Sequence, residues 1–525
     1  MTGHVIGLDL GSSFLYGSID SNSTLFNLHH LQRLNLWDNH FNYSQIPIAI
    51  KRLSMLTYLD LSHSSFIGQI PSELSQLSKL SNLYLCSNPL QLKKPNNLES
   101  LISNFTRLKQ LCLSQVDISS TVPKSLANFS FLTSLQLRDC KLKGEFPVDI
   151  FQLPDLQSLS VRFNKYLSGR LPPILNQNHS LKSLLLAGTS FSGEIPFEKL
   201  ASLSTLDASN CNFSGVIPSD PIGKLNQLTY LNLSENNFVG EIPSSLGNLT
   251  QLTMLSLSSN YFSGPIPLSL SKLINLETLY LYNNDLRDIV DFDIFVGLKN
   301  LTELDLEHNY NLSVIIANPG INETFPQFKE LGLSNCNLRN FPVFLRHQKR
   351  MEALYLDENH IGGPIPEWLF NISKETLSLL SFSGNSLIGE LSHRICNFSS
   401  LKFLDISHNK LVGKLPHCLG NLSKSMLMLT LRSNYFSSNI PTFPEGNQLK
   451  IIDLGYNLFE GKLSKSLSNC KKLGHLNVES NKLNDVFPYW LGTLPELEIL
   501  VLRRNELHGV IGESIKKKMI FQSYE

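Results

Sequence analysis

The chain has 525 residues and carries 44 Lys+Arg against 44 Asp+Glu, so its formal net charge is zero. A general nucleic-acid binder needs a surplus of basic residues to neutralise phosphates, and this balance argues against that class. The hydrophobic content of 42% is enough for a core and argues against a disordered chain. Leucine, with 98 residues, and asparagine, with 48, are both in excess, which indicates one small unit used many times.

Targeting and membrane segments are not evident in the sequence. Residues 1–25 lack the basic start and apolar run of a signal peptide. No apolar run reaches the roughly 18 residues needed to cross a membrane. We therefore expect the chain to have lost such segments or to work without them.

One motif, L-x-x-L-x-L-x-x-N, recurs along nearly the whole chain. A clear copy consists of Leu252, Leu255, Leu257 and Asn260. We count 21 copies. They recur about every 25 residues, within the range of roughly 20 to 29 residues that is typical of leucine-rich repeats. The repeat predicts a single solenoid domain over residues 1–512, followed by an irregular tail over 513–525.

The residues of the motif have distinct physical roles. The x-L-x-L segment alternates, which predicts a short strand with its leucines inward and the intervening residues outward. One coil cannot bury its leucines alone, but stacked coils bury them and pair their strands in a long parallel sheet. The Asn follows the strand, where its amide can pair with backbone groups that would otherwise be buried without partners.

The Asn position is occupied by Asn in fourteen of the 21 copies. The substitutes are Cys140, Cys211, Cys336, Ser13, Ser64, Thr189 and Val116. Cys, Ser and Thr can donate a hydrogen bond, whereas Val cannot. We therefore expect the repeat of Val116 to be the least stable of the repeats.

A second signature, F/L-x-G-x-I-P, follows the Asn in several copies, as at residues 262–267. Glycine permits a backbone conformation that other residues avoid, and proline sets an extended entry into the outer side. The fold class is therefore an α/β solenoid: a right-handed leucine-rich-repeat superhelix with a concave parallel β-sheet and short or 3-10 helices on its convex side. Residues 89–107, 285–300 and 310–327 break the rhythm, and we expect loops or longer helices there.

This signature and spacing resemble plant extracellular leucine-rich repeats. Residues 3–42 and 454–492 closely resemble plant receptor-like proteins of the disease-resistance type. The resemblance implies a partial ectodomain of a plasma-membrane protein that faces the cell exterior. It also implies that the membrane is reached only through a span absent from this chain, and that signalling runs through co-receptor kinases.

No catalytic, cofactor or metal site is expected, because the chain has no zinc-ligand, nucleophile-elbow or phosphate-loop motif. We predict a recognition ectodomain that binds a pathogen-derived or peptide elicitor in defence. Two alternatives stay open. One is the ectodomain of a leucine-rich-repeat receptor kinase, and the other is a secreted inhibitor of microbial wall-degrading enzymes.

Fourteen N-x-S/T sequons favour an extracellular chain. Five lie on the convex side just before a buried apolar residue, where a glycan would project to solvent: Asn128, Asn248, Asn371, Asn397 and Asn421. Asn232 lies on the concave sheet and is a doubtful acceptor.

The eight cysteines divide by their position in the repeat. The ladder cysteines and Cys470 should be buried thiols. Cys396 and Cys418 fall on the convex side of successive coils, so a disulfide between them is possible in an oxidising compartment.

The side chains at the outward strand positions do not pack in the core, so they are available to contact a protein or peptide ligand. Aromatic residues and arginine dominate binding hot spots. The first candidate cluster consists of Tyr280, Tyr282, Glu307, Tyr355 and Asp357. Its aromatic faces and carboxylates could hold a peptide that carries Lys or Arg. A second cluster consists of Arg138, Arg162 and Phe163.

Overall fold

The computed structural model describes residues 4–93, 97–173, 180–316, 325–422, 424–509 and 511. The tail expected over residues 513–525 lies outside the described residues. The chain divides into two compact units, Met1–Leu276 and Glu277–Glu525. Each unit is described by itself.

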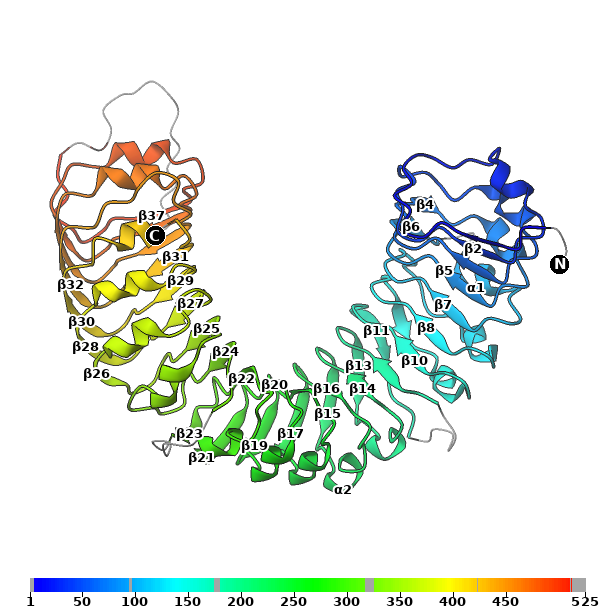
Figure 1. The fold of residues 1–525 in the computed structure, drawn as a ribbon, viewed down its shortest axis with the longest axis horizontal. Helices are drawn as coiled ribbons and strands as arrows, with labels where there is room; N and C mark the ends of the chain where they lie inside the picture. Colours follow the sequence, from blue (N-terminus) through cyan, green and yellow to red (C-terminus); the bar gives the residue numbers. More distant parts are fainter. Residues whose placement is uncertain are drawn as a thin grey trace. The chain divides into compact units, whose positions relative to one another are not determined.

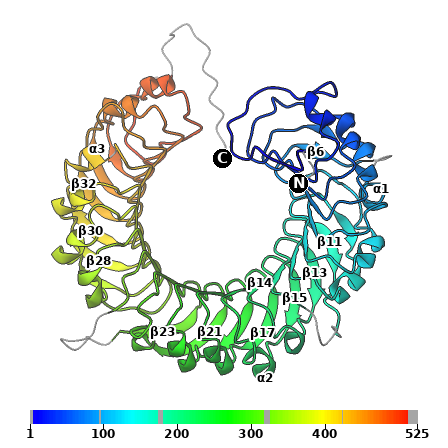
Figure 2. The same cartoon turned by 45° about the vertical axis from the view of Figure 1, so that its right-hand side comes forward.

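Each unit contains a run of parallel three-residue strands, the main sheet. Figure 2 shows that the strands line the inner side of each unit and the helices its outer side. The main-sheet strands of the first unit are β1 (Gly7–Asp9), β2 (Arg33–Asn35), β3 (Tyr58–Asp60), β5 (Asn82–Tyr84), β7 (Gln110–Cys112), β8 (Ser134–Gln136), β10 (Ser158–Ser160), β12 (Ser183–Leu185), β14 (Thr205–Asp207), β16 (Tyr230–Asn232) and β18 (Met254–Ser256). Those of the second are β20 (Thr278–Tyr280), β22 (Glu303–Asp305), β24 (Glu330–Gly332), β25 (Ala353–Tyr355), β27 (Leu379–Ser381), β29 (Phe403–Asp405), β31 (Met428–Thr430), β33 (Ile451–Asp453), β35 (His475–Asn477) and β37 (Ile499–Val501).

These 21 strands confirm the predicted solenoid, with one strand for each copy of the motif. The register is in phase from coil to coil, as in the pairing of Leu304 with Leu331 and of Leu331 with Leu354. All three leucines are fully buried, because strand alternation turns them into the core. The outward residues therefore form continuous rows that cross the strands.

A second set of strands, the lateral strands, follows the ladder position (Figure 1). In the first unit β4 (Gly68–Gln69) pairs with β6 (Leu90–Gln91), and a further ladder consists of β9 (Lys143–Glu145), β11 (Tyr166–Gly169), β13 (Ser190–Gly193), β15 (Asn212–Gly215), β17 (Asn237–Glu241) and β19 (Tyr261–Gly264). In the second unit β21 (Asp285–Asp291) pairs with β23 (Asn311–Ile315), and a further ladder consists of β26 (Gly362–Pro364), β28 (Ser386–Glu390), β30 (Lys410–Gly413), β32 (Tyr435–Ser438), β34 (Leu458–Gly461) and β36 (Lys482–Leu483).

The outer side consists of one-turn helices. The α-helices are α1 (Leu98–Ile102), α2 (Ser219–Ile222) and α3 (Leu419–Leu422). The 3-10 helices are Thr24–Asn27, Ile48–Arg52, Ser72–Gln76, Lys124–Asn128, Val148–Gln152, Phe197–Lys199, Ser244–Asn248, Leu268–Lys272, Phe292–Phe295, Val343–His347, Glu367–Asn371, His393–Asn397, Lys465–Asn469 and Tyr489–Thr493. Many begin after the proline of the second signature, whose fixed φ suits a helix start.

The expectation of loops or longer helices was wrong for two of the three irregular stretches, because the stretch 310–327 contains the strand β23 and the stretch 285–300 is also largely extended. Residues 285–300 form the seven-residue strand β21 and a one-turn 3-10 helix. The strand forms because Leu286 and Val290 are buried while the residues between them are exposed, and its backbone pairs with β23. The stretch 89–107 does contain the helix α1.

The asparagine ladder links successive coils. The side-chain amide of Asn260 donates to the carbonyls of Leu233 and Leu257 at 2.9 and 3.2 Å, and its oxygen accepts from the amide of Phe238 at 3.0 Å. The residue is 6% exposed. One side chain thus satisfies buried backbone groups of its own coil and the preceding one.

Candidate functional site

The first candidate cluster lies in one piece on the main sheet of the second unit. In-register pairing of β20, β22, β24 and β25 places Tyr280, Asp305, Gly332 and Tyr355 in one row across the sheet. A parallel row contains Thr278, Glu303 and Glu330. The five predicted residues are half-buried, so they are partly desolvated and still accessible.

The structure adds three carboxylates to the predicted cluster: Glu303, Asp305 and Glu330. The hydroxyl of Tyr280 donates to Oε2 of Glu303 at 2.5 Å. The rings of Tyr280 and Tyr282 meet edge to face, with centroids 6.2 Å apart. We call the eight residues the acidic-tyrosine surface: Tyr280, Tyr282, Glu303, Asp305, Glu307, Glu330, Tyr355 and Asp357.

Serine hydroxyls hold the carboxylates at one end of this surface. Ser334 donates to Oε1 of Glu307 at 2.5 Å and lies 3.4 Å from Oδ2 of Asp357. Ser381 and the amide of Ser383 donate to Oδ1 of Asp357 at 2.5 and 2.7 Å. These donors fix the orientation of the carboxylates without neutralising their charge.

Gly332 allows the close packing at the centre of the surface. A Cβ atom at this position would lie 2.6 Å from Oδ1 of Asp305 and 2.9 Å from Cγ of Glu307. Any larger residue would therefore push the two acids apart.

Burial and mutual repulsion raise the proton affinity of the acids. Burial, with the charge of Glu307, raises the pKa of Asp305 to about 8. Burial raises the pKa of Asp357 to about 6 and that of Tyr355 to about 12. Burial also raises the pKa of Glu330, with a contribution from the charge of Glu303. The surface is short of positive charge.

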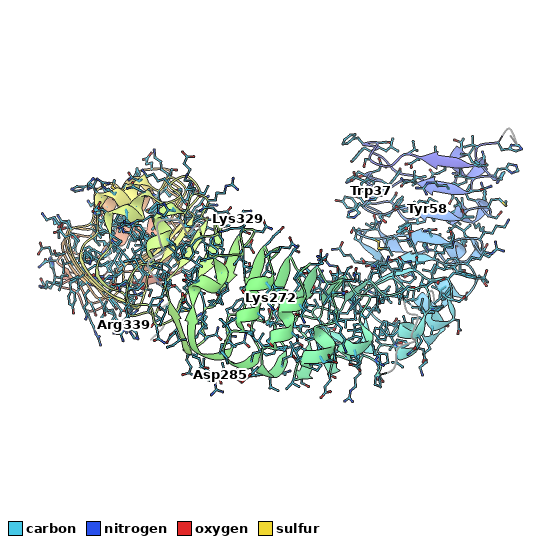
Figure 3. All side chains as sticks on the ribbon, turned by 60° about the horizontal axis from the view of Figure 1, so that its bottom comes forward. Trp37, Tyr58, Lys272, Asp285, Lys329 and Arg339 are labelled. Carbon is cyan, nitrogen blue, oxygen red and sulfur yellow. A yellow bond between two sulfur atoms is a disulfide. The ribbon has the colours of Figure 1, made fainter. Side chains whose placement is uncertain are left out.

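No lysine or arginine in the described part of the chain forms an ion pair with these carboxylates. Lys329, labelled in Figure 3, precedes Glu330 and is exposed without pairing to it. The charge of His308 lowers the pKa of Glu307, but burial outweighs it and the net shift is upward. A cation from outside the chain would thus find preorganised acceptors.

The second candidate cluster lies on the main sheet of the first unit. The ring of Phe163 is 47% exposed, and the guanidinium groups of Arg138 and Arg162 lie 4.9 and 5.3 Å from its centre. Arg162 also forms an ion pair of 2.8 Å with Asp207, which is 1% exposed. Arg162 therefore neutralises a buried acid, and only Arg138 and Phe163 are left to contact a ligand.

One main-sheet cluster was missed by the sequence reasoning. The guanidinium of Arg33 lies 3.6 Å from the ring centre of Tyr58, which packs against Tyr84 at 5.5 Å. Tyr58 is labelled in Figure 3. Arg33 and Tyr58 face each other only because β2 and β3 pair in register. Aligning the strands of successive repeats in register would have predicted the contact between Arg33 and Tyr58.

The predicted glycosylation positions share one place in the fold. Asn128, Asn248, Asn371 and Asn397 are each the last residue of a 3-10 helix, and all are exposed. The side chain of Asn421 lies outside the described part of the structure. Asn232, at the end of β16, accepts hydrogen bonds from Ser234 at 3.1 and 2.7 Å on the main sheet.

The cysteines form two pairs and four free thiols. Cys396 and Cys418 are disulfide-bonded, with Cα atoms 6.0 Å apart. Cys86 and Cys112 form a second disulfide on the main-sheet face, which the sequence reasoning did not foresee. The free cysteines are Cys140, Cys211, Cys336 and Cys470, all buried.

Neither a metal site nor a membrane helix is found in what the structure describes. Among the described residues, no three His, Cys, Asp or Glu side chains are grouped to hold a metal ion. None of the helices in this part of the chain combines the length and apolar character needed to cross a membrane.

The repeats, the in-phase sheet and the ladder define a leucine-rich-repeat protein. Family models described as "Leucine-rich repeat region" and "Leucine Rich Repeat" match residues 180–318, and 55–77 and 400–422, respectively. Receptor-like protein 6 of Arabidopsis thaliana is 35% identical over 97% of this chain and 56% of its own length. The chain belongs to the leucine-rich-repeat family of plant receptor-like proteins.

Solved receptor ectodomains have a similar fold. The PEPR1–AtPEP1 complex is 30% identical with a TM-score of 0.66, and the match covers 96% of this chain and 69% of that one. The Arabidopsis receptor kinase HAESA, in complex with the peptide hormone IDA and the co-receptor SERK1, is 28% identical with a TM-score of 0.61. That match covers 96% of this chain and 83% of the other. The chain spans about half the length of receptor-like protein 6.

Proposed function

We propose that this chain is the ligand-recognition part of a plant cell-surface receptor-like protein and that its acidic-tyrosine surface binds a basic peptide. The observation that carries the proposal is the set of five clustered carboxylates without an ion-pair partner in the described part of the chain. A Lys or Arg side chain of a ligand would supply the missing charge through charge-assisted hydrogen bonds.

The tyrosines supply the second half of the recognition. A cation over an aromatic face gains about 0.5 to 2 kcal/mol, depending on its desolvation. Tyr280 is held in place by Glu303, whereas the hydroxyl of Tyr355 has no hydrogen-bond partner in the described part of the chain. A ligand can therefore stack on a fixed ring and bond to a free hydroxyl.

The wider role rests on the family. We propose that the complete protein lies in the plasma membrane with this chain outside the cell, and that it signals in defence through partner receptor kinases. The resemblance to disease-resistance receptors supports this role, as does the solved HAESA complex, which contains a co-receptor. The chain itself is proposed to bind and not to catalyse.

The test uses a panel of immobilised nonapeptides that each carry two Lys or Arg residues, with Glu-for-Lys counterparts as controls. We expect the chain to bind basic members of the panel and none of the acidic ones. Replacement of Tyr280, Tyr282 and Tyr355 by Ala should weaken binding at least tenfold. Replacement of Tyr435 by Ala, at an exposed tyrosine of the lateral strand β32, is the matched control and should leave binding unchanged. Equal binding by the triple variant, with normal expression, would overturn the site.

The same triple variant in the complete receptor tests the defence role. We expect loss of immune output at normal expression.

A second candidate is the ectodomain of a receptor kinase, because the solved HAESA ectodomain belongs to that class. The full-length transcript separates the two. A membrane span with a short tail supports the receptor-like protein, and a kinase domain supports the alternative.

A further inference from the structure

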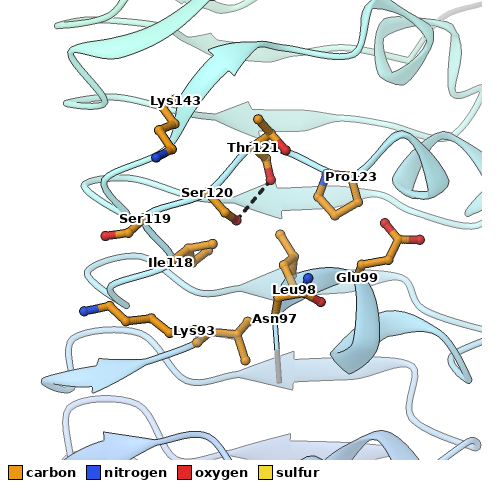
Figure 4. A pocket seen from close by; sticks show the side chains of 11 residues that line it. Lys93, Asn97, Leu98, Glu99, Ile118, Ser119, Ser120, Thr121, Pro123 and Lys143 are labelled. Atoms are coloured by element: carbon orange, nitrogen blue, oxygen red, sulfur yellow. Dashed lines mark hydrogen bonds between the residues drawn. The ribbon is translucent and has the colours of Figure 1, made fainter. Parts of the chain in front are cut away.

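A cavity of about 590 Å³ lies on the lateral side of the first unit, far in sequence from the acidic-tyrosine surface. It opens between α1 and the segment 118–123 (Figure 4). The residues around it come from three successive repeats. No residue of either candidate cluster lines it, so its use does not depend on the proposed function.

The cavity lies where the repeat of Val116 has no lateral strand. Gly68, two repeats before it, and Gly144, in the next repeat, take φ angles of +82° and +76° within β4 and β9. The repeat directly before it has Leu92 at this position and still forms β6. Ser120 occupies the equivalent position and does not take a positive φ, whereas Asp288 and Ser438 take φ angles of 76° and 75° there, within β21 and β32. The backbone instead turns at Ser119, with φ 48°, and only an isolated pairing joins Asp117 to Gln91.

The missing strand leaves backbone donors unused. The amide groups of Ser120 and Thr121, which both line the cavity, have no acceptor in the described part of the chain. The hydroxyl of Ser120 bonds only to the carbonyl of Thr121, at 3.3 Å (Figure 4). An oxyanion at this rim would provide acceptors for these donors.

The rim carries a surplus of positive charge. The ammonium groups of Lys93 and Lys141 both contact Oδ2 of Asp117, at 3.0 and 2.9 Å. Ser119 donates to the other oxygen of the same carboxylate. Lys143 lines the cavity and forms no ion pair within the described residues. Within the described residues, two ammonium groups thus share the carboxylate of Asp117, and the third, that of Lys143, is not paired.

The floor of the cavity is apolar. Leu98 and Ile118 are each 1% exposed and form its floor. Figure 4 shows the polar ends of Lys93, Ser119 and Lys143 on one side and Glu99 on the opposite side, with the two apolar residues between them. A matching ligand has a negative group next to a compact hydrophobic group.

We propose that this cavity binds a carboxylate carried next to a compact apolar group, with the carboxylate at Lys93 and Lys143 and the apolar group over Leu98 and Ile118. The C-terminal residue of a peptide with an aliphatic side chain has this chemistry, and so does a small free carboxylic acid. Glu99 disfavours a second negative charge at the far end, because like charges repel.

The experiment titrates the full chain with N-acetyl-Ala-Leu acid and N-acetyl-Ala-Leu amide by ligand-observed NMR. We expect the acid to bind at least tenfold more tightly than the amide. Hexanoate is the third probe and separates the two sources. If the dipeptide acid binds more tightly than hexanoate, the site is assigned to peptide C-termini. If the dipeptide acid and hexanoate bind equally, the site is assigned to small free carboxylic acids. Equal binding of acid and amide, or no binding of any probe, would overturn the proposal.

Variants locate the binding. Lys93→Ala with Lys143→Ala should weaken binding of the acid at least fivefold, and Thr121→Trp should abolish it by filling the cavity from its exposed rim. Lys182→Ala, an exposed lysine in a different repeat, is the control and should bind as the native chain does. Native-like thermal unfolding of each variant shows that it is folded. Unchanged binding in both the lysine pair and Thr121→Trp would place the acid elsewhere.

Discussion

The side-chain oxygen of Asn88 accepts a hydrogen bond from the backbone amide of Ser64, in the preceding repeat, at 3.0 Å. Val116 occupies the next ladder position and has no side-chain oxygen that could accept in the same way from the backbone amide of Asn88. Val116 is fully buried and offers no acceptor. In the described part of the chain, the backbone amide of Asn88 is left without a hydrogen-bond acceptor. A buried, unpaired amide costs about 1 to 3 kcal/mol.

We therefore expect Val116→Asn to raise the free energy of unfolding by about 1 kcal/mol, since new hydrogen bonds outweigh the lost apolar contact. Asn260→Val, the reverse change at an intact rung, should lower it by about 2 to 4 kcal/mol, because it leaves several buried backbone groups unpaired. Urea unfolding measures both. A stabilising Asn260→Val would contradict the role of the ladder.

The raised pKa values predict how stability depends on pH. An unfolded Asp titrates near about 3.9. Between that value and about 8 for Asp305, or about 6 for Asp357, the native chain binds more protons than the unfolded chain. The contribution of these two carboxyl groups to the free energy of unfolding is then fully present below about pH 3.9 and is lost as the pH rises through their native pKa values. We expect the melting temperature to fall between about pH 5 and pH 8, and Asp305→Asn to flatten this slope. A steeper fall of the melting temperature with pH in Asp305→Asn would contradict the raised pKa of Asp305.

Binding of a basic peptide should have the opposite pH dependence. A cation favours ionised carboxylates, so binding lowers the pKa of Asp305 and Asp357 and releases protons. Affinity should rise between about pH 5 and pH 8, and Asp357→Asn should reduce the rise. Calorimetry in buffers of different ionisation enthalpy counts the released protons. Proton uptake on binding would refute this assignment.

The free thiols should be inert in the folded chain. Burial raises the pKa of Cys140 to about 12 and of Cys470 to about 11, which leaves little reactive thiolate at neutral pH. We expect iodoacetamide to label neither until the chain is unfolded. After mild reduction, the four disulfide cysteines, which are all partly exposed, should be labelled before the buried thiols: Cys86, Cys112, Cys396 and Cys418. Mass spectrometry of tryptic peptides reads out each site, and early labelling of Cys140 would contradict the prediction.

Glycan attachment should follow exposure on the helix side. With a signal peptide supplied in plant cells, deglycosylation should reduce the mass of the chain. Asn248→Gln and Asn371→Gln should each remove one glycan, whereas Asn232→Gln should change nothing because its side chain is bonded on the main sheet. A glycan found at Asn232 would contradict the rule that attachment follows exposure on the helix side, and no glycan at any site would count against the extracellular assignment.

The regular part of the fold could be predicted because each repeat is a local unit. Leucine alternation located every main-sheet strand, and the Asn position located each turn. The seven-residue strand β21 was missed because its two buried residues, Leu286 and Val290, are separated by three exposed ones. Such spacing does not signal a strand without the neighbour β23 that supplies its hydrogen bonds.

The candidate site was harder to predict, since it depends on which residues face each other across strands. Glu303 and Glu330 join the tyrosines only through the register of β22 and β24. Cys86 and Cys112 occupy different positions in their repeats, so comparing equal positions could not pair them. The cavity beside Ser120 could not be predicted from the missing glycine of the second signature, because Asp288 and Ser438 also replace that glycine and still lie in lateral strands.

The spacing of the main sheet sets a rule for any extended partner that crosses it. Tyr280 and Tyr355 stand three strands apart in one row. At roughly 4.8 Å per strand this is about 14 Å, which an extended peptide covers in about four residues at roughly 3.4 Å each. Side chains four residues apart point to the same face. A ligand lying across these strands can thus present two anchors, at positions i and i+4, to both tyrosines at once, whereas anchors three or five residues apart would point one of them to solvent.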